Sequence, residues 1–180
     1  MTVKIITANG GSDSLDFGCA RTAIVATVTG TEVSSGEGKL ELKTTTGGTS
    51  AAKMTVAANG LVTVANDLTV SGKTTLASYA ETVVAIGNSG TAKTLSLAAG
   101  TVQTVTLTGN CTFTMPATTA GMSFTLLVFT GDGDFTGTFT DVKFPANTAP
   151  TITTTASRWD LLSFISEGNH WFGSYIQAFQ

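Results

Sequence analysis

Threonine alternates with apolar residues along much of this chain, and no other feature constrains its fold as strongly. One residue in five of the 180 is threonine, and the alternation is clearest over 102–108, 111–115 and 137–141. Threonine is branched at Cβ, so its side chain has little rotamer freedom and suits a pleated sheet. Alternation at a period of two predicts strands with one buried and one exposed face. The chain is therefore predicted to be all-β.

Turn residues divide the predicted strands into two modules. Residues 1–80 are predicted to form an N-terminal module of short-strand hairpins, in which Asn59-Gly60 is a strong hairpin signal. Residues 81–180 carry longer strands with short turns, which predicts an antiparallel β-sandwich or jelly-roll-like module. Nine of the ten phenylalanines and both tryptophans lie beyond residue 110, so the larger core is predicted in this second module.

The individual strands follow from the same signals. In the N-terminal module, strands are predicted over 3–7, 21–29, 39–43, 54–56, 61–64 and 68–70, with a turn at 9–12 and loops at 30–38 and 44–51. In the C-terminal module, strands are predicted over 93–97, 101–108, 111–115, 123–130, 135–144, 159–167 and 170–179. The alternation within 39–43 predicts that Leu40 and Leu42 face the core. The charged residues around them, Lys39, Glu41 and Lys43, are predicted to face water.

Charge is scarce for a protein of this hydropathy. Charged residues make up 12% of the chain, about half the usual share of ~25%, while the mean hydropathy is +0.27. This combination predicts that other subunits cover much of the surface, and strands of three or four residues need such neighbours. The alternative is an ordinary sandwich with a threonine-coated surface. A net charge of −3 argues against nucleic-acid binding. No apolar run approaches the ~20 residues of a membrane span.

The cysteines and the N-terminus carry little functional signal. Cys19 and Cys111 lie far apart in the sequence, and they are predicted to be small buried side chains and not a disulfide or a metal site. The first residues, Met1–Ile6, lack a charged start followed by a long apolar run, so no signal peptide is predicted. We expect synthesis in the cytoplasm of a host cell.

Turn and strand residues frame most of the chain in two groups of segments: Gly36–Lys43, Lys53–Val56, Asn59-Gly60 and Asp67–Gly72, then Trp159–Ile165 and Gly168–Phe172. The first group resembles a module of tailed-phage fibres and other exterior virion proteins, and the second is similar to the ending of many such proteins. In that family a G-x-L strand precedes an M-x-I…G-x-V hairpin and an L-x-V-x-G strand. The resemblance implies a homotrimer and transfers no catalytic residue. The short chain, without a long coiled coil, tail-anchoring segment or His-x-His tip repeats, favours a compact capsid-bound trimer over a short tail fibre.

The aspartates of the second module and its histidine are candidates for a ligand or catalytic site. Asp132, Asp134 and Asp141 could offer oxygen ligands to Ca²⁺, which needs six to eight, but the other ligands cannot be identified and a polar hairpin turn is the favoured explanation. His170 is the single histidine. It is expected at the start of a strand as a surface or turn residue, and the alternative is a ring of three imidazoles on a threefold axis.

The other candidates are acidic and aromatic. Glu32, Glu37 and Glu41 lie in or beside one predicted loop, where a glycosidase would need two carboxylates across a groove, but loop glutamates are usually solvated. A sugar-stacking face could be formed by four aromatic residues, Trp159, Trp171, Phe172 and Tyr175, although on strands these favour the core. The sequence therefore predicts no enzyme and no catalytic, cofactor-binding or metal-binding residue.

Together these patterns predict a structural protein on the outside of a phage particle. The favoured form is a homotrimeric decoration or cement protein whose partners are its own copies and the major capsid protein or another virion protein. The arm Met1–Leu15 or the rest of the first module is expected to face the capsid. The alternative is a short tail fibre that binds a host glycan or receptor through loops 131–133 and 145–150. Nucleic acid and membrane are not expected as partners.

Overall fold

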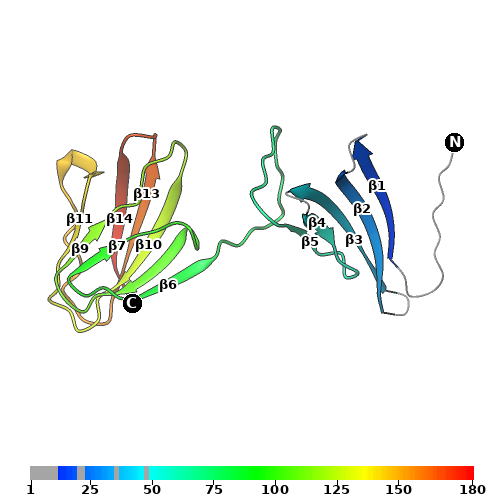
Figure 1. The fold of residues 1–180 in the computed structure, drawn as a ribbon. Coiled ribbons are helices and arrows are strands. Elements are labelled where there is room, and N and C mark those ends of the chain that lie inside the picture. The colour runs from blue at the N-terminus through cyan, green and yellow to red at the C-terminus, as the bar shows by residue number, and fades with distance from the viewer. Residues whose placement is uncertain (1–11, 20–22, 35–36, 47–48) are drawn as a thin grey trace. The chain divides into compact units, whose positions relative to one another are not determined.

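The computed structural model describes residues 12–19, 23–34, 37–46 and 49–180. The chain divides into two compact units, Met1–Thr75 and Leu76–Gln180, close to the boundary expected at residue 80. The described residues form fourteen strands and one short 3₁₀ helix, Pro145–Asn147, so the prediction of an all-β fold is confirmed (Figure 1). None of these residues belongs to a helix that is long and apolar enough to cross a membrane.

The N-terminal unit is one antiparallel sheet in which neighbours in sequence are neighbours in space. Its strands, coloured blue to cyan in Figure 1, are β1 (Ser12–Cys19), β2 (Ala23–Ser34), β3 (Glu37–Thr46), β4 (Thr49–Val56) and β5 (Val62–Val64), in that order across the sheet. The turn between β4 and β5 contains Asn59 and Gly60, as the hairpin signal predicts. There the Asn59 Oδ1 accepts a hydrogen bond of 3.0 Å from the Leu61 backbone N–H.

The strands of this unit are longer than expected. The segments 30–38 and 44–51, predicted as loops, are largely strand, because β2 continues to Ser34 and β3 spans Glu37–Thr46. Their threonines and valine are strong strand formers, and pairing such as Thr44↔Ala51 satisfies backbone groups that a loop leaves to water. Residues 68–70, predicted as a strand, form none. The predicted strand 3–7 and most of the turn 9–12 lie outside the described residues.

The C-terminal unit pairs a six-stranded sheet with a three-stranded one. The large sheet has the order β12-β14-β13-β10-β8-β6, and the small one has the order β11-β9-β7. The strands are β6 (Val83–Asn88), β7 (Ala92–Thr94), β8 (Val102–Thr106), β9 (Cys111–Thr114), β10 (Ser123–Phe129), β11 (Gly137–Phe139), β12 (Val142–Lys143), β13 (Trp159–Ser166) and β14 (Trp171–Phe179). The segment 135–144, predicted as one strand, is split into β11 and β12.

The sequence predicts an antiparallel sandwich for this unit, and the structure has mixed pairing there. Antiparallel pairs join β10 to β13 and β13 to β14, while β6–β8, β8–β10, β12–β14 and both pairs of the small sheet are parallel. The chain alternates between sheets from β6 to β12, so each strand returns to its own sheet in its earlier direction. Successive windings thus add one strand to each sheet, and only the hairpin β13–β14 breaks this order.

The hydrophobic core of the unit includes side chains from both sheets. Every buried hydrophobic side chain among the described residues falls between Leu95 and Trp171, in agreement with the aromatic distribution. Phe124 stacks on Phe164 with ring centroids 4.7 Å apart and meets the edge of Trp171 at 5.2 Å. Phe113 of the small sheet stacks on Phe139 at 5.1 Å. One face of the large sheet is therefore occupied by the core.

Candidate functional site

The three aspartates considered as Ca²⁺ ligands lie in two different turns. Asp132 and Asp134 belong to the turn between β10 and β11, and Asp141 belongs to the turn between β11 and β12. Asp134 and Asp141 have left-handed backbones, with φ of 63° and 55°. Nowhere in the described part of the chain do three His, Cys, Asp or Glu residues gather in a group that could hold a metal ion. The geometry of these aspartates is that of turn residues.

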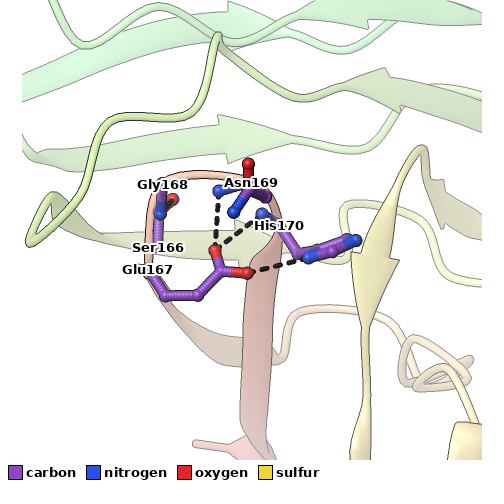
Figure 2. A network of polar contacts seen from close by, with 5 residues as sticks. All are labelled: Ser166, Glu167, Gly168, Asn169 and His170. Carbon is purple, nitrogen blue, oxygen red and sulfur yellow. Dashed lines mark hydrogen bonds and ion pairs between the residues drawn. The ribbon is translucent and has the colours of Figure 1, made fainter.

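The candidate histidine belongs to a hydrogen-bonded turn that joins β13 to β14 (Figure 2). Glu167 Oε2 accepts hydrogen bonds from the backbone N–H groups of Asn169, at 2.7 Å, and His170, at 2.8 Å. Its Oε1 lies 2.8 Å from His170 Nδ1. These contacts, those of His170 first, lower the pKa of Glu167 to about 2. His170 is thus an exposed turn residue, as expected, whose ring is held by Glu167.

Removing the imidazole should raise the pKa of Glu167. In His170→Ala we expect a pKa between about 2 and the ordinary 4.5, because both backbone donors remain. A carboxyl group with a depressed pKa stabilises the fold above its unfolded pKa, and that contribution disappears as the pH falls from 4.5 through about 2. Carbon-detected NMR titration of the glutamate carboxyl groups measures this directly. Asn169→Ala, which keeps the backbone donor, is the matched control. A value unchanged in His170→Ala would contradict the assigned contact.

A polar hollow of about 530 Å³ adjoins this turn. Its polar lining includes Asp141, Lys143, Asn147, Asn169 and His170. The topology thereby brings together two residues, Asp141 and His170, that the sequence analysis treated as separate candidates. The mixture of acidic, basic and amide groups suits a polar, uncharged ligand better than a strongly charged one.

The four candidate aromatic residues do not share one face. The Trp171 ring is only 1% exposed, and its indole N–H donates a hydrogen bond of 2.8 Å to the Pro116 carbonyl, so it belongs to the core. Tyr175 also lies on the inner side, where its ring meets that of Phe144 at 6.3 Å. Trp159 and Phe172 lie on the opposite side of the large sheet, as the register between β13 and β14 shows. No joint stacking platform results.

The glutamates considered for glycoside hydrolysis are placed on strands. Glu37 begins β3 and Glu41 lies within it, while the side chain of Glu32 lies outside the described residues. Glu41 is bound on both sides, by Lys39 Nζ and Lys43 Nζ, each at 3.1 Å. Hydrogen bonds to Lys39 and then Lys43 lower the pKa of Glu41. A carboxylate held in this way is poorly suited to act as an acid.

In the sheet of the N-terminal unit the less exposed side is opposite to the one predicted. Glu41 is the buried residue, with 9% of its surface exposed, whereas Leu40 and Leu42 are 43% and 40% exposed. The prediction that these leucines face the core is therefore wrong. Alternation shows which residues share a face but not which face is covered, and the stems of Lys39 and Lys43 can shield the carboxylate between them.

The leucines belong to an apolar surface, here called the N-unit face. Cross-strand pairing places seven described side chains on it: Val28, Leu40, Leu42, Met54, Val56, Val62 and Val64. None of the seven is charged, and none is fully buried. The opposite side of the sheet carries Lys39, Glu41 and Lys43. Within a single chain the apolar side of this sheet is thus the less covered one.

A larger apolar surface lies on the side of the six-stranded sheet that faces away from the core. We call it the outer face and define it by seventeen residues that the strand register aligns: Val83, Ala85, Val102, Thr104, Thr106, Ser123, Thr125, Leu127, Phe129, Trp159, Leu161, Ser163, Ile165, Phe172, Ser174, Ile176 and Phe179. None of these seventeen is charged, and Lys143 of the edge strand β12 is paired with Phe172 on the same side. Five of them, Val83, Ile165, Phe172, Ile176 and Phe179, are exposed large hydrophobic side chains. Such contiguous patches usually mark interaction sites.

The outer face was not predicted from the sequence, although the sequence contains a signal for it. In β10 the inner residues Phe124, Leu126 and Val128 alternate with Leu127 and Phe129, so both sides of the strand are apolar. Strands that are apolar on both sides are typical of sheets covered on both faces. In this unit only the inner side is covered by the core.

The two cysteines are also placed in part. Cys111 is buried, its thiol lies 3.8 Å from the Ser89 carbonyl, and burial raises the pKa of the Cys111 thiol. This confirms that Cys111 is a buried side chain, while the side chain of Cys19 lies outside the described residues.

No protein-family model, curated protein sequence or solved structure matches the chain. Evidence for its function therefore comes from its own surfaces.

Proposed function

We propose that the chain is a non-enzymatic structural protein of the outside of a phage particle, a homotrimeric decoration or cement protein of the head. One observation supports this proposal most: each of the two units leaves uncovered a sheet face whose described side chains are mainly apolar. Burial of apolar surface contributes about 25 cal/mol per Å², so two such faces favour association with two kinds of surface. The low charge content and the virion-protein-like motifs agree with this role.

The two faces suit different partners in such a particle. The N-unit face belongs to the module expected to contact the capsid, and it is the smaller of the two. A bound decoration protein would bridge neighbouring capsid subunits and add buried area that resists the internal pressure of packaged DNA. The aromatic-rich C-terminal unit would then carry the contacts between copies.

The number of copies per particle tests this function. Quantitative mass spectrometry of purified virions should find hundreds of copies of the chain beside the major capsid protein. A few to some tens of copies would instead indicate a tail fibre. Absence of the chain from the particle would overturn both placements.

A charge on the N-unit face should weaken attachment to the capsid. We expect Leu42→Lys to lower the occupancy of capsids that lack the native protein at least tenfold, because a lysine there must be desolvated against an apolar partner. Leu42 is partly exposed already, so the variant should fold. Co-sedimentation with capsids measures the occupancy. Thr63→Lys, on the opposite side of the same sheet, is the matched control, and equal loss in both variants would exclude a specific role of this face.

Attachment to a host is the second candidate function, and the polar hollow beside the β13–β14 turn favours it. Loops that are positioned by a rigid sheet commonly carry recognition, and Asn147 in the hollow belongs to the loop expected to contact a receptor. Purified protein should then block adsorption of the phage to its host, and Asn147→Ala together with His170→Ala should relieve the block. No effect of the purified protein on adsorption would exclude this candidate.

A further inference from the structure

We propose that copies of this chain pack against one another through the outer face of the six-stranded sheet. The inference rests on the self-association proposed above, and it names the surface that carries that association. The face contains seventeen aligned residues from five strands. A standard protein interface takes ~20–30 residues from each partner, so where the face is shared between two neighbours, each contact depends mainly on its large exposed apolar side chains.

The outer face offers both halves of a complementary contact. At one end of β13 lies a hollow of about 280 Å³, lined only by Leu127, Trp159, Leu161 and Phe179. Ile165 lies toward the other end of the same strand and is 56% exposed. An apolar hollow is best filled by an apolar side chain, and this face carries such side chains outside the hollow.

The positions of these features suit a closed ring of copies. The hollow and Ile165 lie at opposite ends of β13. Ile165 of one copy can therefore enter the hollow of the next copy, while the hollow of the first copy stays free to receive Ile165 from another. Contacts between two different patches of one subunit generate rings when the rotation closes. The proposed homotrimer requires this type of contact.

The charge distribution selects a second copy over other partners. None of the seventeen residues is charged, and the one charged residue that the strand register aligns with this side is Lys143 of β12, which pairs with Phe172 at the sheet edge. A single edge lysine offers little to nucleic acid or to an acidic headgroup. None of the acidic residues that give each chain its net charge of −3 belongs to this face, so copies meet there with few like charges close together. Its serines and threonines can form hydrogen bonds with water in the isolated chain. They can form hydrogen bonds with the same groups of a neighbouring copy in the assembly.

Sedimentation of the full chain at micromolar concentration tests the inference. The unchanged protein should sediment as a discrete oligomer, and Ile165→Lys and Ile176→Lys should each shift it toward the monomer with at least 100-fold weaker association. Both side chains are exposed, at 56% and 61%, so the monomeric variants should remain folded. Circular dichroism checks their folding. Thr114→Lys, at an exposed position of the small sheet, should leave the oligomer intact.

Fluorescence provides an independent reading of the same surface. The chain has two tryptophans, of which Trp171 is buried in the core and Trp159 lines the hollow. Dilution of the unchanged protein should therefore shift the emission to longer wavelength, because dissociation exposes Trp159 to water. The Ile165→Lys variant should show the shifted emission at every concentration.

The possible outcomes separate this inference from the proposed function. An oligomer that survives both lysine variants would overturn the outer face as the interface but leave the homotrimer standing. A monomer in the unchanged protein would overturn both. Loss of the oligomer in Thr114→Lys as well would show that any added charge dissociates it, and this too would reject a specific role for the face.

Discussion

Replacing Asp160 by alanine should lower the free energy of unfolding of the C-terminal unit by about 3–5 kcal/mol. The Asp160 carboxylate is fully buried. It accepts three hydrogen bonds: from the Thr153 N–H and Thr153 hydroxyl, each at 2.7 Å, and from the Ala178 N–H at 2.9 Å. Alanine would leave two backbone donors without an acceptor, in a region where Ala178 already has a left-handed φ of 61°. Chemical denaturation at fixed chain concentration measures the change.

A smaller change at the same site is the control for Asp160→Ala. Thr153→Val removes only the hydroxyl donor, so we expect a loss of about 1 kcal/mol. If Asp160→Ala costs no more than Thr153→Val, the carboxylate is not the clamp that these distances describe. The comparison also tests whether Asp160 ties β13 both to the preceding loop and to the end of β14.

Gly133→Ala should destabilise the same unit by about 3 kcal/mol or more, through backbone strain and a collision together. Gly133 has a φ of 83°, and a Cβ placed on it would lie 2.4 Å from the Thr154 carbonyl oxygen. That oxygen belongs to the backbone and cannot move away cheaply. A thermal melt at fixed chain concentration should show a fall of at least 10 °C, since ~1 kcal/mol corresponds to 4–8 °C for a unit of this size.

Gly121→Ala separates strain from collision. Gly121 has a φ of 80°, but a Cβ there would meet nothing within 4 Å, so we expect a cost of about 1–2 kcal/mol. Asp132→Ala, beside Gly133, should be nearly neutral if this segment is a structural turn. A large effect of Asp132→Ala that depended on added Ca²⁺ would instead support Asp132 as a Ca²⁺ ligand.

Local patterns in the sequence predicted local structure well. The alternation around Thr104 and Thr112 located β8 and β9, and Asn59-Gly60 located the β4–β5 turn. The positions of the phenylalanines and tryptophans located the larger core. Each of these signals depends on residues close together in the chain, where turn geometry and side-chain period leave few choices.

Features set by distant parts of the chain could not be predicted in this way. The alternation through Leu40, Glu41 and Leu42 is the same whichever side of the sheet is exposed. It therefore predicted which residues share a side but not which of the two sides is exposed. A period of two also does not say which sheet a strand joins, and therefore the parallel pairing in the C-terminal unit was missed. Asp141 and His170 line one hollow only because β12 pairs with β14, a long-range choice that neither residue encodes.

The shortness of most edge strands in the C-terminal unit has a consequence for how the chain behaves in quantity. Three of its four sheet edges are β7, β11 and β12, which are only two or three residues long. Exposed edges are the templates on which strands of other molecules add to form fibrils, and short edges give them little to build on. Crowded copies therefore have little opportunity for open-ended polymerisation at these three edges, which leaves the broad sheet surface for assemblies of fixed size.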